Sequence, residues 1–334
     1  MRGLFLGSGP FGIPALRRLQ EVWPDLVVGT VPDAPQGRQR KLAPCPLKKA
    51  ALESGLEIFE TDRLKGKSGR EFLQLTGAEL VMTADIRLIL GRSFLEGVPL
   101  GCFNLHGSIL PRWRGAAPIV RALLAGDEEI GVSLYRMVPA LDAGPVVAVH
   151  RWAPPENVTA DQAEEYLSER AADLLIDNLA ALQSGQPPLL DQDDALATFA
   201  PKVEKSEGWI QWGESADHID RQIRALQPWP KTRSLWSPAQ MADEASETLI
   251  LHQAAALESS SDRQESAVES PGTVVEVSEE GIVVVCGHGL IRIERLQRAG
   301  KKPLQAVEFL RGLKIAPGDS FLDPPQQTKG ESGR

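Results

Sequence analysis

The first half of the chain alternates short apolar runs with amphipathic segments, and turn residues separate them. Five runs have the length and the apolar content of buried strands. They cover residues 3–6, 26–31, 56–59, 79–84 and 102–105. Segments with helical spacing lie between them, beginning near Ile13, Cys45 and Arg70. This alternation predicts an α/β fold, a doubly wound and mostly parallel sheet of the Rossmann-like type.

Residues 115–125 have the pattern of a helix with Pro118 in its first turn, where proline is tolerated. Residues 131–137 and 146–151 are predicted to be a closing pair of strands. A long helix is predicted from Thr159, and Ser-Gly-Gln-Pro-Pro after residue 183 ends it. The first domain is therefore expected to cover residues 1–186, and residues 187–205 are expected to be a linker.

The second half has a different pattern, in which a single helix at 216–226 precedes several Val/Ile/Leu-rich strands. Short strands with turns between them favour a small β-barrel of the OB type over residues 206–322. Residues 254–270, rich in Ala, Ser, Gln and Glu, are expected to be an insertion, and residues 323–334 a disordered tail. The four expected strands cover residues 248–252, 272–277, 281–286 and 289–296.

Composition narrows the class of protein. The chain has 334 residues, enough for two domains, and its net charge of −9 argues against a surface that binds nucleic acid throughout. Three distant cysteines indicate a reducing compartment without a disulfide framework, and no cysteine or histidine pair has metal-ligand spacing. The N-terminal apolar run is too short for a signal peptide. A cytoplasmic enzyme without a metal is expected.

Two side chains with complementary chemistry lie at the end of the fifth predicted strand. Asn104 and His106 are two residues apart, so they leave an extended backbone on the same face. They lie at the carboxyl end of a strand, where open α/β sheets bind ligands. An amide can donate to a developing oxyanion, and an imidazole can move a proton near neutral pH. Asp142, in the Gly/Pro-rich loop after residue 137, is the best candidate to orient the imidazole.

The segments FNLHGSILPRWRGAAPI (103–119) and LDAG (141–144) resemble the catalytic signature of the folate-dependent formyltransferases. LPRWRGAAPI resembles in particular the members that act on methionyl-tRNA. The resemblance implies transfer of a formyl group from 10-formyltetrahydrofolate, as co-substrate, to the α-amino group of initiator methionyl-tRNA. It also implies that Asn104, His106 and Asp142 are catalytic. We expect a monomer.

The resemblance assigns the folate side of the site to Ile86, Leu88, Ser108, Leu110 and Pro111. Two nearby segments depart from the pattern of this family. Residues 7–12 read GSGPFG, where Gly-Thr-Pro and an acidic residue are usual. Residues 84–86 read Ala-Asp-Ile, where Ala-Tyr-Gly is usual.

Residues 34–52 contain several basic side chains and no acidic one, and their first half is rich in Pro and Gly. On its own this pattern fits a solvated surface loop or an arm that contacts phosphates. The resemblance favours an arm that enters the acceptor stem of initiator tRNA. Its basic residues, with others carried over from the domain junction and the second domain, form the predicted tRNA set. That set is Arg38, Arg40, Lys41, Lys205, Arg298, Lys301 and Lys302.

Three alternatives remain from the sequence. The acceptor could be another amine, such as an amino sugar or a nucleotide precursor. GSGPFG also matches G-x-G-x-x-G, and Asp33 follows about 20 residues later, as in dinucleotide-binding oxidoreductases. Pro10 lacks the backbone N–H that a phosphate-binding turn uses. Finally, the unusual Asp85 and Ile86 are compatible with a tRNA-binding module whose folate pocket has degenerated.

Overall fold

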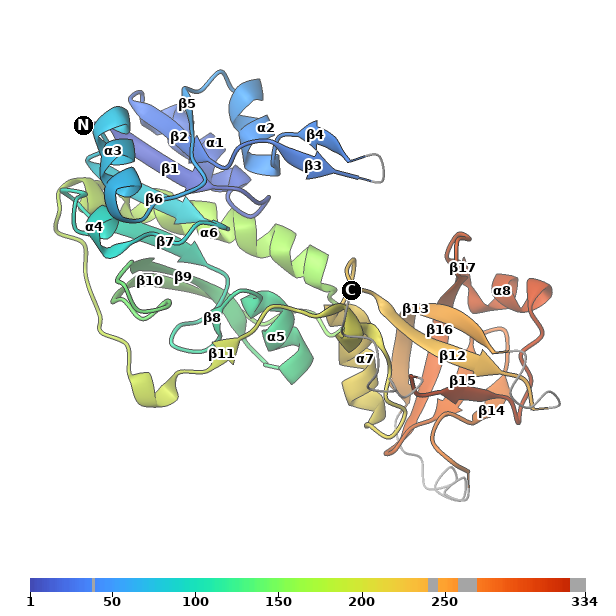
Figure 1. Cartoon of the computed structure of the whole chain (residues 1–334). Coiled ribbons are helices and arrows are strands. Elements are labelled where there is room, and N and C mark those ends of the chain that lie inside the picture. Colours follow the sequence, from blue (N-terminus) through green and yellow to red (C-terminus); the bar gives the residue numbers. More distant parts are fainter. Residues whose placement is uncertain (38–39, 240–245, 258–268, 325–334) are drawn as a thin grey trace. The chain divides into compact units, whose positions relative to one another are not determined.

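The computed structural model describes residues 1–37, 40–239, 246–257 and 269–324. The chain forms two compact units. Unit 1 comprises residues 1–122, 127–156 and 162–202, and unit 2 comprises residues 123–126, 157–161 and 203–334. Figure 1 shows the elements of both units in chain order. No helix in the described part of the chain is long and apolar enough to cross a membrane.

Unit 1 is built on a seven-stranded sheet with the strand order β10-β9-β7-β6-β1-β2-β5. The five strands from β5 to β7 are parallel, β9 is antiparallel to β7, and β10 is antiparallel to β9. This confirms the mostly parallel α/β sheet. The strands are β1 Gly3–Gly7, β2 Leu26–Thr30, β5 Ile58–Glu60, β6 Leu80–Ala84, β7 Cys102–His106, β9 Ile130–Arg136 and β10 Val146–Trp152.

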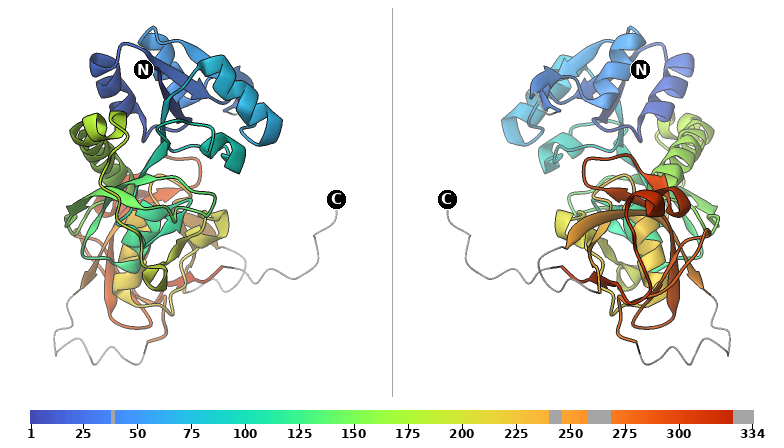
Figure 2. Two further views of the ribbon diagram at one scale, coloured as in Figure 1. Left: turned by 90° about the vertical axis from the view of Figure 1, so that its left-hand side faces the viewer. Right: turned by 90° about the vertical axis from the view of Figure 1, so that its right-hand side faces the viewer.

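Helices cover both faces of this sheet, with α1 and α6 on one side and α3 and α4 on the other (Figure 2). Arg18 of α1 forms ion pairs with Glu169 and Asp173 of α6, which places these two helices side by side. Because both faces are covered, β1, β2, β6 and β7 are buried at every residue. The helices are α1 Ile13–Val22, α2 Pro46–Glu53, α3 Gly66–Thr76, α4 Arg92–Leu95, α5 Pro118–Ala125 and α6 Ala160–Gln183.

The basic segment after β2 is not a simple loop. It contains an antiparallel hairpin of β3 (Ala34–Gln36) and β4 (Lys41–Ala43), followed by α2. Gln36 stabilises the hairpin, because its side-chain amide donates to the carbonyl groups of Ala43 and Pro44. The sequence pattern did not predict these strands, because Pro35 lies within β3 and Gly37 and Pro44 directly follow β3 and β4.

Of the residues 187–205 that were expected to form a linker, those up to Lys202 belong to unit 1. The 3-10 helix η1 (Asp194–Leu196) and the strand β11 (Phe199–Ala200) fold back onto unit 1. β11 pairs in parallel with β8 (Arg114–Gly115), in the segment that follows β7. The physical reason is hydrogen bonding: backbone N–H groups of this segment find their acceptors in β11 and next to it.

Unit 2 is an antiparallel sheet with the strand order β14-β15-β16-β13-β12-β18, and β17 pairs with β16. Bonds between β18 and the start of β14 nearly close it into a barrel, as expected. α7 packs against the barrel through Ile219 and Ile223, which belong to its buried core. The elements are η2 Lys205–Gly208, α7 Ala216–Ala225, β12 Thr232–Ser237, β13 Glu247–Leu257, β14 Val274–Val277, β15 Ile282–Val285, β16 Leu290–Arg298, β17 Leu304–Gln305, α8 Ala306–Gly312 and β18 Ser320–Leu322.

Gly272 lies at the closure of this barrel. Its backbone has a φ of +92°, and a Cβ atom there would lie 2.1 Å from the carbonyl oxygen of Phe321. Phe321 N donates to Gly272 O, and Val274 N donates to Asp319 O. The two edge strands can therefore approach each other because residue 272 has no side chain.

Several features of unit 2 differ from the sequence prediction. β12, β17, β18 and α8 were not predicted, and β13 continues to Leu257 where an insertion was expected from Ala254. Residues 254–257 pair with β16 residue by residue, which explains why this Ala-rich stretch is a strand. Most of the expected insertion, and the expected tail beyond Pro324, lie outside the described residues.

Candidate active site

Three polar side chains form a row across the carboxyl end of the sheet in unit 1. Thr83 of β6 pairs with Asn104 of β7, and Asn104 pairs with Tyr135 of β9. Thr83 Oγ1 donates to Asn104 Oδ1 over 2.6 Å, and Asn104 Nδ2 donates to Tyr135 Oη over 3.3 Å. One N–H of the Asn104 amide thus has a partner. The second can donate to a ligand.

Asp142 meets this row from the loop between β9 and β10. Tyr135 Oη donates to Asp142 Oδ1 over 2.6 Å, and the backbone N–H of Gly115 donates to Asp142 Oδ2 over 2.8 Å. The backbone of Asp142 has a φ of +48°, a left-handed conformation that Asp tolerates better than most residues. Both carboxylate oxygens are therefore held by donors from other segments of the chain.

The imidazole of His106 is buried next to Asp142. His106 Nε2 lies 2.8 Å from the carbonyl oxygen of Trp113, and because a carbonyl only accepts, this nitrogen carries the proton. His106 Nδ1 lies 3.9 Å from Asp142 Oδ2, too far for a hydrogen bond. Among the described residues, Nδ1 has no hydrogen-bond partner. Nδ1 is therefore the nitrogen that can exchange a proton with a ligand.

The loop after β7 is itself held in place by side-chain hydrogen bonds. Ser133 Oγ donates to the carbonyl group of Ser108 over 2.7 Å and accepts from Leu110 N over 3.0 Å. Ser108 Oγ donates to the carbonyl group of Arg112 over 2.6 Å. The hydroxyl of Ser108 thus stabilises the loop itself, and Leu110 packs against Tyr135 and Val146.

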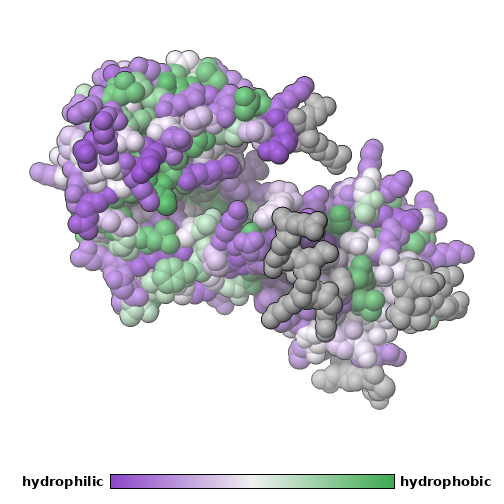
Figure 3. Space-filling view, viewed as in Figure 1, coloured by the Kyte–Doolittle hydropathy of each residue, from purple (hydrophilic) through white to green (hydrophobic). Residues whose placement is uncertain are grey.

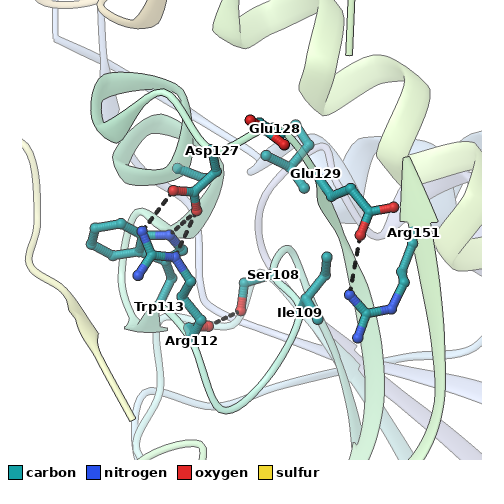
Figure 4. Close-up of a pocket in the computed structure, with 10 residues that line it drawn as sticks. Ser108, Ile109, Arg112, Trp113, Asp127, Glu128, Glu129 and Arg151 are labelled. Carbon is teal, nitrogen blue, oxygen red and sulfur yellow. Dashed lines mark hydrogen bonds and ion pairs between the residues drawn. The ribbon is translucent and has the colours of Figure 1, made fainter. Parts of the chain in front are cut away.

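Trp113 lines a pocket of about 380 Å³ together with Arg112 and Asp127 (Figure 4). Its indole N–H donates to Asp127 over 2.7 Å, and the guanidinium group of Arg112 lies 4.6 Å from its ring and bonds the same carboxylate. Burial raises the pKa of Asp127, but hydrogen bonds from Arg112 and Trp113 outweigh it and lower the pKa overall. These contacts hold the Trp113 carbonyl group that binds His106.

The segment expected to be a linker also supports the site. Gln192 Nε2 donates to the carbonyl groups of Asp142 and Gly144 over 2.8 and 2.6 Å. Arg114 is buried, and its guanidinium group bonds Gln192 and Asp194. Gly115, whose N–H binds Asp142, has a φ of +128° and pairs with Ala200. The position of Asp142 therefore depends on residues 192–200.

The residues predicted for the folate side lie on two neighbouring loops. Ile86 and Leu88 follow β6 and pack, partly buried, against the core of unit 1. Ser108 and Leu110 are buried after β7, and Pro111 is half-buried next to them. Both loops follow the carboxyl ends of adjacent strands, as the sequence predicted. Their role in folate binding stays a prediction.

The GSGPFG turn does not present open phosphate-binding groups. The backbone N–H groups of Ser8 and Gly9 donate to the carbonyl group of Asp85 over 3.1 and 3.3 Å, and Ser8 Oγ donates to it over 2.9 Å. Asp33 forms an ion pair with Lys48. The two departures from the family pattern are thus packed on each other, and these contacts disfavour the dinucleotide-binding alternative.

The predicted tRNA residues are distributed over both units. In unit 1, Arg40 and Lys41 are exposed on the β3–β4 hairpin, where hydrophilic side chains gather (Figure 3). Arg38 lies outside the described residues. In unit 2, Lys205, Lys301 and Lys302 are exposed, and Arg298 pairs with Glu247 over 2.7 Å. The charge of Arg298 is thus partly compensated.

No group of three or more His, Cys, Asp and Glu side chains within the described ranges is arranged to hold a metal ion. The three cysteines are buried and unpaired.

Comparison with protein families defines the class. Residues 13–179 match the formyl transferase domain, and residues 202–314 match the formyl transferase C-terminal domain. The chain belongs to the formyl transferase family.

Similar proteins indicate one branch of the formyl transferase family. The chain is 38% identical to the methionyl-tRNA formyltransferase of Methylobacillus flagellatus, over 96% of this chain and 99% of that protein. It is 37% identical to the enzyme of the same name from Moorella thermoacetica, over 96% and 98%. The branch is therefore that of the methionyl-tRNA formyltransferases.

Solved structures share the fold at low sequence identity. A sugar 3N-formyl transferase, crystallised with dTDP and 5-N-formyl-THF, has a TM-score of 0.61 and 16% identity, with 90% of this chain and 99% of that chain covered. An N-formyltransferase from Helicobacter canadensis has a TM-score of 0.62 and 14% identity, with 88% and 98% covered.

Sequence reasoning missed several residues that build the site. Thr83 and Tyr135 lie near the ends of predicted strands, but their place beside Asn104 depends on the register of β6, β7 and β9. Gln192 and Arg114 gave no comparable signal, since their contacts depend on the fold-back of residues 187–202.

Proposed function

We propose that this protein transfers the formyl group of 10-formyltetrahydrofolate to the α-amino group of initiator methionyl-tRNA. The observation that carries the proposal is the linked group of Asn104, His106 and Asp142 at the carboxyl end of the sheet, in a chain that belongs to this family. The name of the similar enzymes gives methionyl-tRNA as the acceptor, and a formyl-folate is bound in a structural neighbour. The side chains supply a hydrogen-bond donor, a proton carrier and an orienting carboxylate.

Formyl transfer between nitrogens needs few protein groups. The attacking amine has a reference pKa of about 8, so a useful fraction is neutral at working pH without an activated serine or cysteine. Its attack on the formyl carbon forms a tetrahedral oxyanion. The second N–H of Asn104 is the donor for that oxygen, and such donors contribute on the order of 10²- to 10³-fold to rate.

His106 and Asp142 carry out the proton transfer. As Nε2 is held by the Trp113 carbonyl group, the proton exchanged with the substrates is the one at Nδ1. Asp142 Oδ2 lies 3.9 Å from Nδ1, close enough to accept a hydrogen bond from the ring when Nδ1 takes up a proton and the two side chains approach. The proton removed from the attacking amine then becomes available to the departing N10. Holding both substrates in line supplies much of the remaining acceleration.

The acceptor is proposed to be tRNA rather than a small amine because the chain carries features that a small acceptor does not need. These are the exposed cations of the β3–β4 hairpin and the basic end of β16 in unit 2. Arg40 and Lys41 form no ion pair with any residue in the described part of the chain. Uncompensated cations suit a phosphate backbone.

The test is an acceptor competition with radiolabelled 10-formyltetrahydrofolate. We expect label in N-formylmethionine after incubation with charged initiator tRNA, at a rate that falls steeply with salt concentration. We expect none in an amino-sugar nucleotide offered at millimolar concentration. Label found only in the amino sugar would show that the acceptor is an amino sugar and not tRNA. Label in neither acceptor would favour a tRNA-binding module over a formyltransferase.

A further inference from the structure

Tyr135 occupies the centre of the site, although the sequence signature does not contain it. It is almost fully buried, with 1% of its surface exposed, and its ring lies edge-on to His106 with 6.3 Å between the centroids. Its hydroxyl oxygen forms hydrogen bonds with the side chains of both Asn104 and Asp142. We propose that Tyr135 is a positioning residue for formyl transfer, which selects the orientation of the Asn104 amide and holds the Asp142 carboxylate. This inference rests on the proposed function.

The single proton of the Tyr135 hydroxyl is committed to Asp142. A carboxylate only accepts hydrogen bonds, so at an Oη–Oδ1 distance of 2.6 Å the phenol must be the donor. Burial, followed by the nearby negative charge of Asp142, raises the pKa of Tyr135 well above its ordinary value. The phenol therefore keeps its proton throughout the neutral range, and towards Asn104 its oxygen can only accept.

An oxygen that only accepts discriminates between the two ends of an amide. Asn104 presents Nδ2 to Tyr135 and Oδ1 to Thr83. The hydroxyl group of Thr83 could donate or accept, so it would tolerate either orientation. After a flip, Oδ1 would face the lone pairs of Tyr135 Oη. Tyr135 thus holds the Asn104 amide in the orientation in which Nδ2, the only end that can donate, keeps its second N–H available to an oxyanion.

The same hydroxyl limits the rotation of Asp142. With Oδ1 bound to Tyr135 and Oδ2 bound to Gly115 N, the carboxylate keeps Oδ2 towards His106 Nδ1. Without the phenol, only the Gly115 bond remains, and the carboxylate can turn about it. Loss of the hydroxyl therefore affects the amide and the imidazole together.

The chain contains only two tyrosines, and this offers a matched control. Tyr166 lies on α6, where its ring stacks on Trp152 with 4.2 Å between the centroids. A phenylalanine can keep those ring contacts. We expect Tyr135→Phe to lower kcat by about 10- to 100-fold, as for a lost charge-assisted bond that orients an oxyanion donor. KM for both substrates should stay within about twofold, and Tyr166→Phe should leave kcat unchanged.

A double variant tests whether Tyr135 acts through Asn104. Tyr135→Phe should lower kcat much less in an Asn104→Ala background than in the native protein, since the amide it orients is gone. Full additivity of the two losses would overturn the proposal. So would a native kcat for Tyr135→Phe, or an effect confined to KM, which would make Tyr135 a substrate contact.

A spectroscopic readout is independent of turnover. In Tyr166→Phe protein labelled with ¹³Cζ-tyrosine, Tyr135 gives a single resonance. Asp142→Asn and Asn104→Ala, each added to this background, should shift that resonance, and Asp25→Asn, an exposed control, should not. Unshifted resonances in both site variants overturn the positioning role. If the native protein forms no N-formylmethionine, the proposed function fails, while the NMR result still decides whether this hydroxyl links the two groups.

Discussion

His106 Nδ1 and Asp142 Oδ2 are 3.9 Å apart, while His106 Nε2 is hydrogen-bonded to the Trp113 carbonyl group. The imidazole is thus anchored through one nitrogen and keeps the other for chemistry. The carboxylate is close enough to stabilise a charged ring but is not bonded to it. Apo active sites often show such distances and tighten with substrate bound. The roles of both residues are tested separately below.

Asp142→Asn should impair both catalysis and stability. Two donors, Tyr135 Oη and Gly115 N, bind the two carboxylate oxygens, and an amide offers only one acceptor oxygen. One donor is then left unsatisfied, which costs about 1–3 kcal/mol of unfolding free energy. We expect kcat to fall by at least about 100-fold. Urea unfolding and steady-state kinetics measure the two effects.

The control for this variant is Asp25→Asn, at an exposed position before β2. It should change neither quantity. Native kcat in Asp142→Asn would show that the negative charge of Asp142 is not needed.

The hairpin is expected to act on tRNA and not on folate. In the double variant Arg40→Ala/Lys41→Ala, KM for initiator tRNA should rise about tenfold, and the slope of log affinity against log salt should fall by about two. KM for the folate should stay within twofold. Lys67→Ala/Arg92→Ala is the control, because these exposed cations lie on α3 and α4, away from the hairpin in sequence, and pair with Glu71 and Glu96 four residues further on. Equal losses for both substrates would contradict the role of the hairpin.

The raised pKa of Tyr135 predicts a specific alkaline behaviour. Its folded-state pKa exceeds its unfolded value near 10, so the folded state holds the proton more tightly. The stability from this group is fully present below about pH 10 and is lost as the pH rises further. In Tyr166→Phe protein, absorbance at 295 nm should show no phenolate near pH 10.5 until urea unfolds the chain. A midpoint near pH 10 in folded protein would show that Tyr135 is not buried against Asp142.

Barrel closure in unit 2 should depend on Gly272. Alanine there would combine a φ of +92° with a Cβ atom 2.1 Å from the carbonyl oxygen of Phe321. We expect Gly272→Ala to lower the unfolding free energy by more than about 1–3 kcal/mol, because a clash is added to the strained backbone. Gly312→Ala, with no atom within 4 Å of the added Cβ, is the control. Equal thermal midpoints for the two variants would contradict this account.

Local patterns were sufficient for the sheet of unit 1 and for the signature residues. β6 and β7 are short, fully buried runs, and Asn104 and His106 lie together because their spacing puts them on one face. Asp142 could be predicted as an orienting group, but its distance from His106 could not. The elements that failed depend on contacts distant in sequence. β11 forms by pairing with β8, and Ala254–Leu257 become a strand by pairing with β16.

Tyr135 shows the same limit within the site. From sequence it is one of several apolar residues in a strand, and its place beside Asn104 depends on the register of β7 with β9. The hairpin of β3 and β4 was hidden by its Pro and Gly residues. The register between strands and the packing of residues 187–202 onto unit 1 depend on contacts between segments that are distant in sequence. The pattern of apolar and polar residues along the chain does not encode such contacts.

The most direct test is the single-turnover rate of formyl transfer by His106→Ala, with both substrates saturating. Charged initiator tRNA, 10-formyltetrahydrofolate and excess enzyme are mixed, and N-formylmethionine is followed over time. We predict a rate at least about 10²- to 10⁴-fold below that of the native protein. The affinity for tRNA and the thermal midpoint should be unchanged, and His218→Ala, on α7, should react at the native rate. A rate for His106→Ala within a few-fold of native would contradict the claim that this imidazole moves the proton.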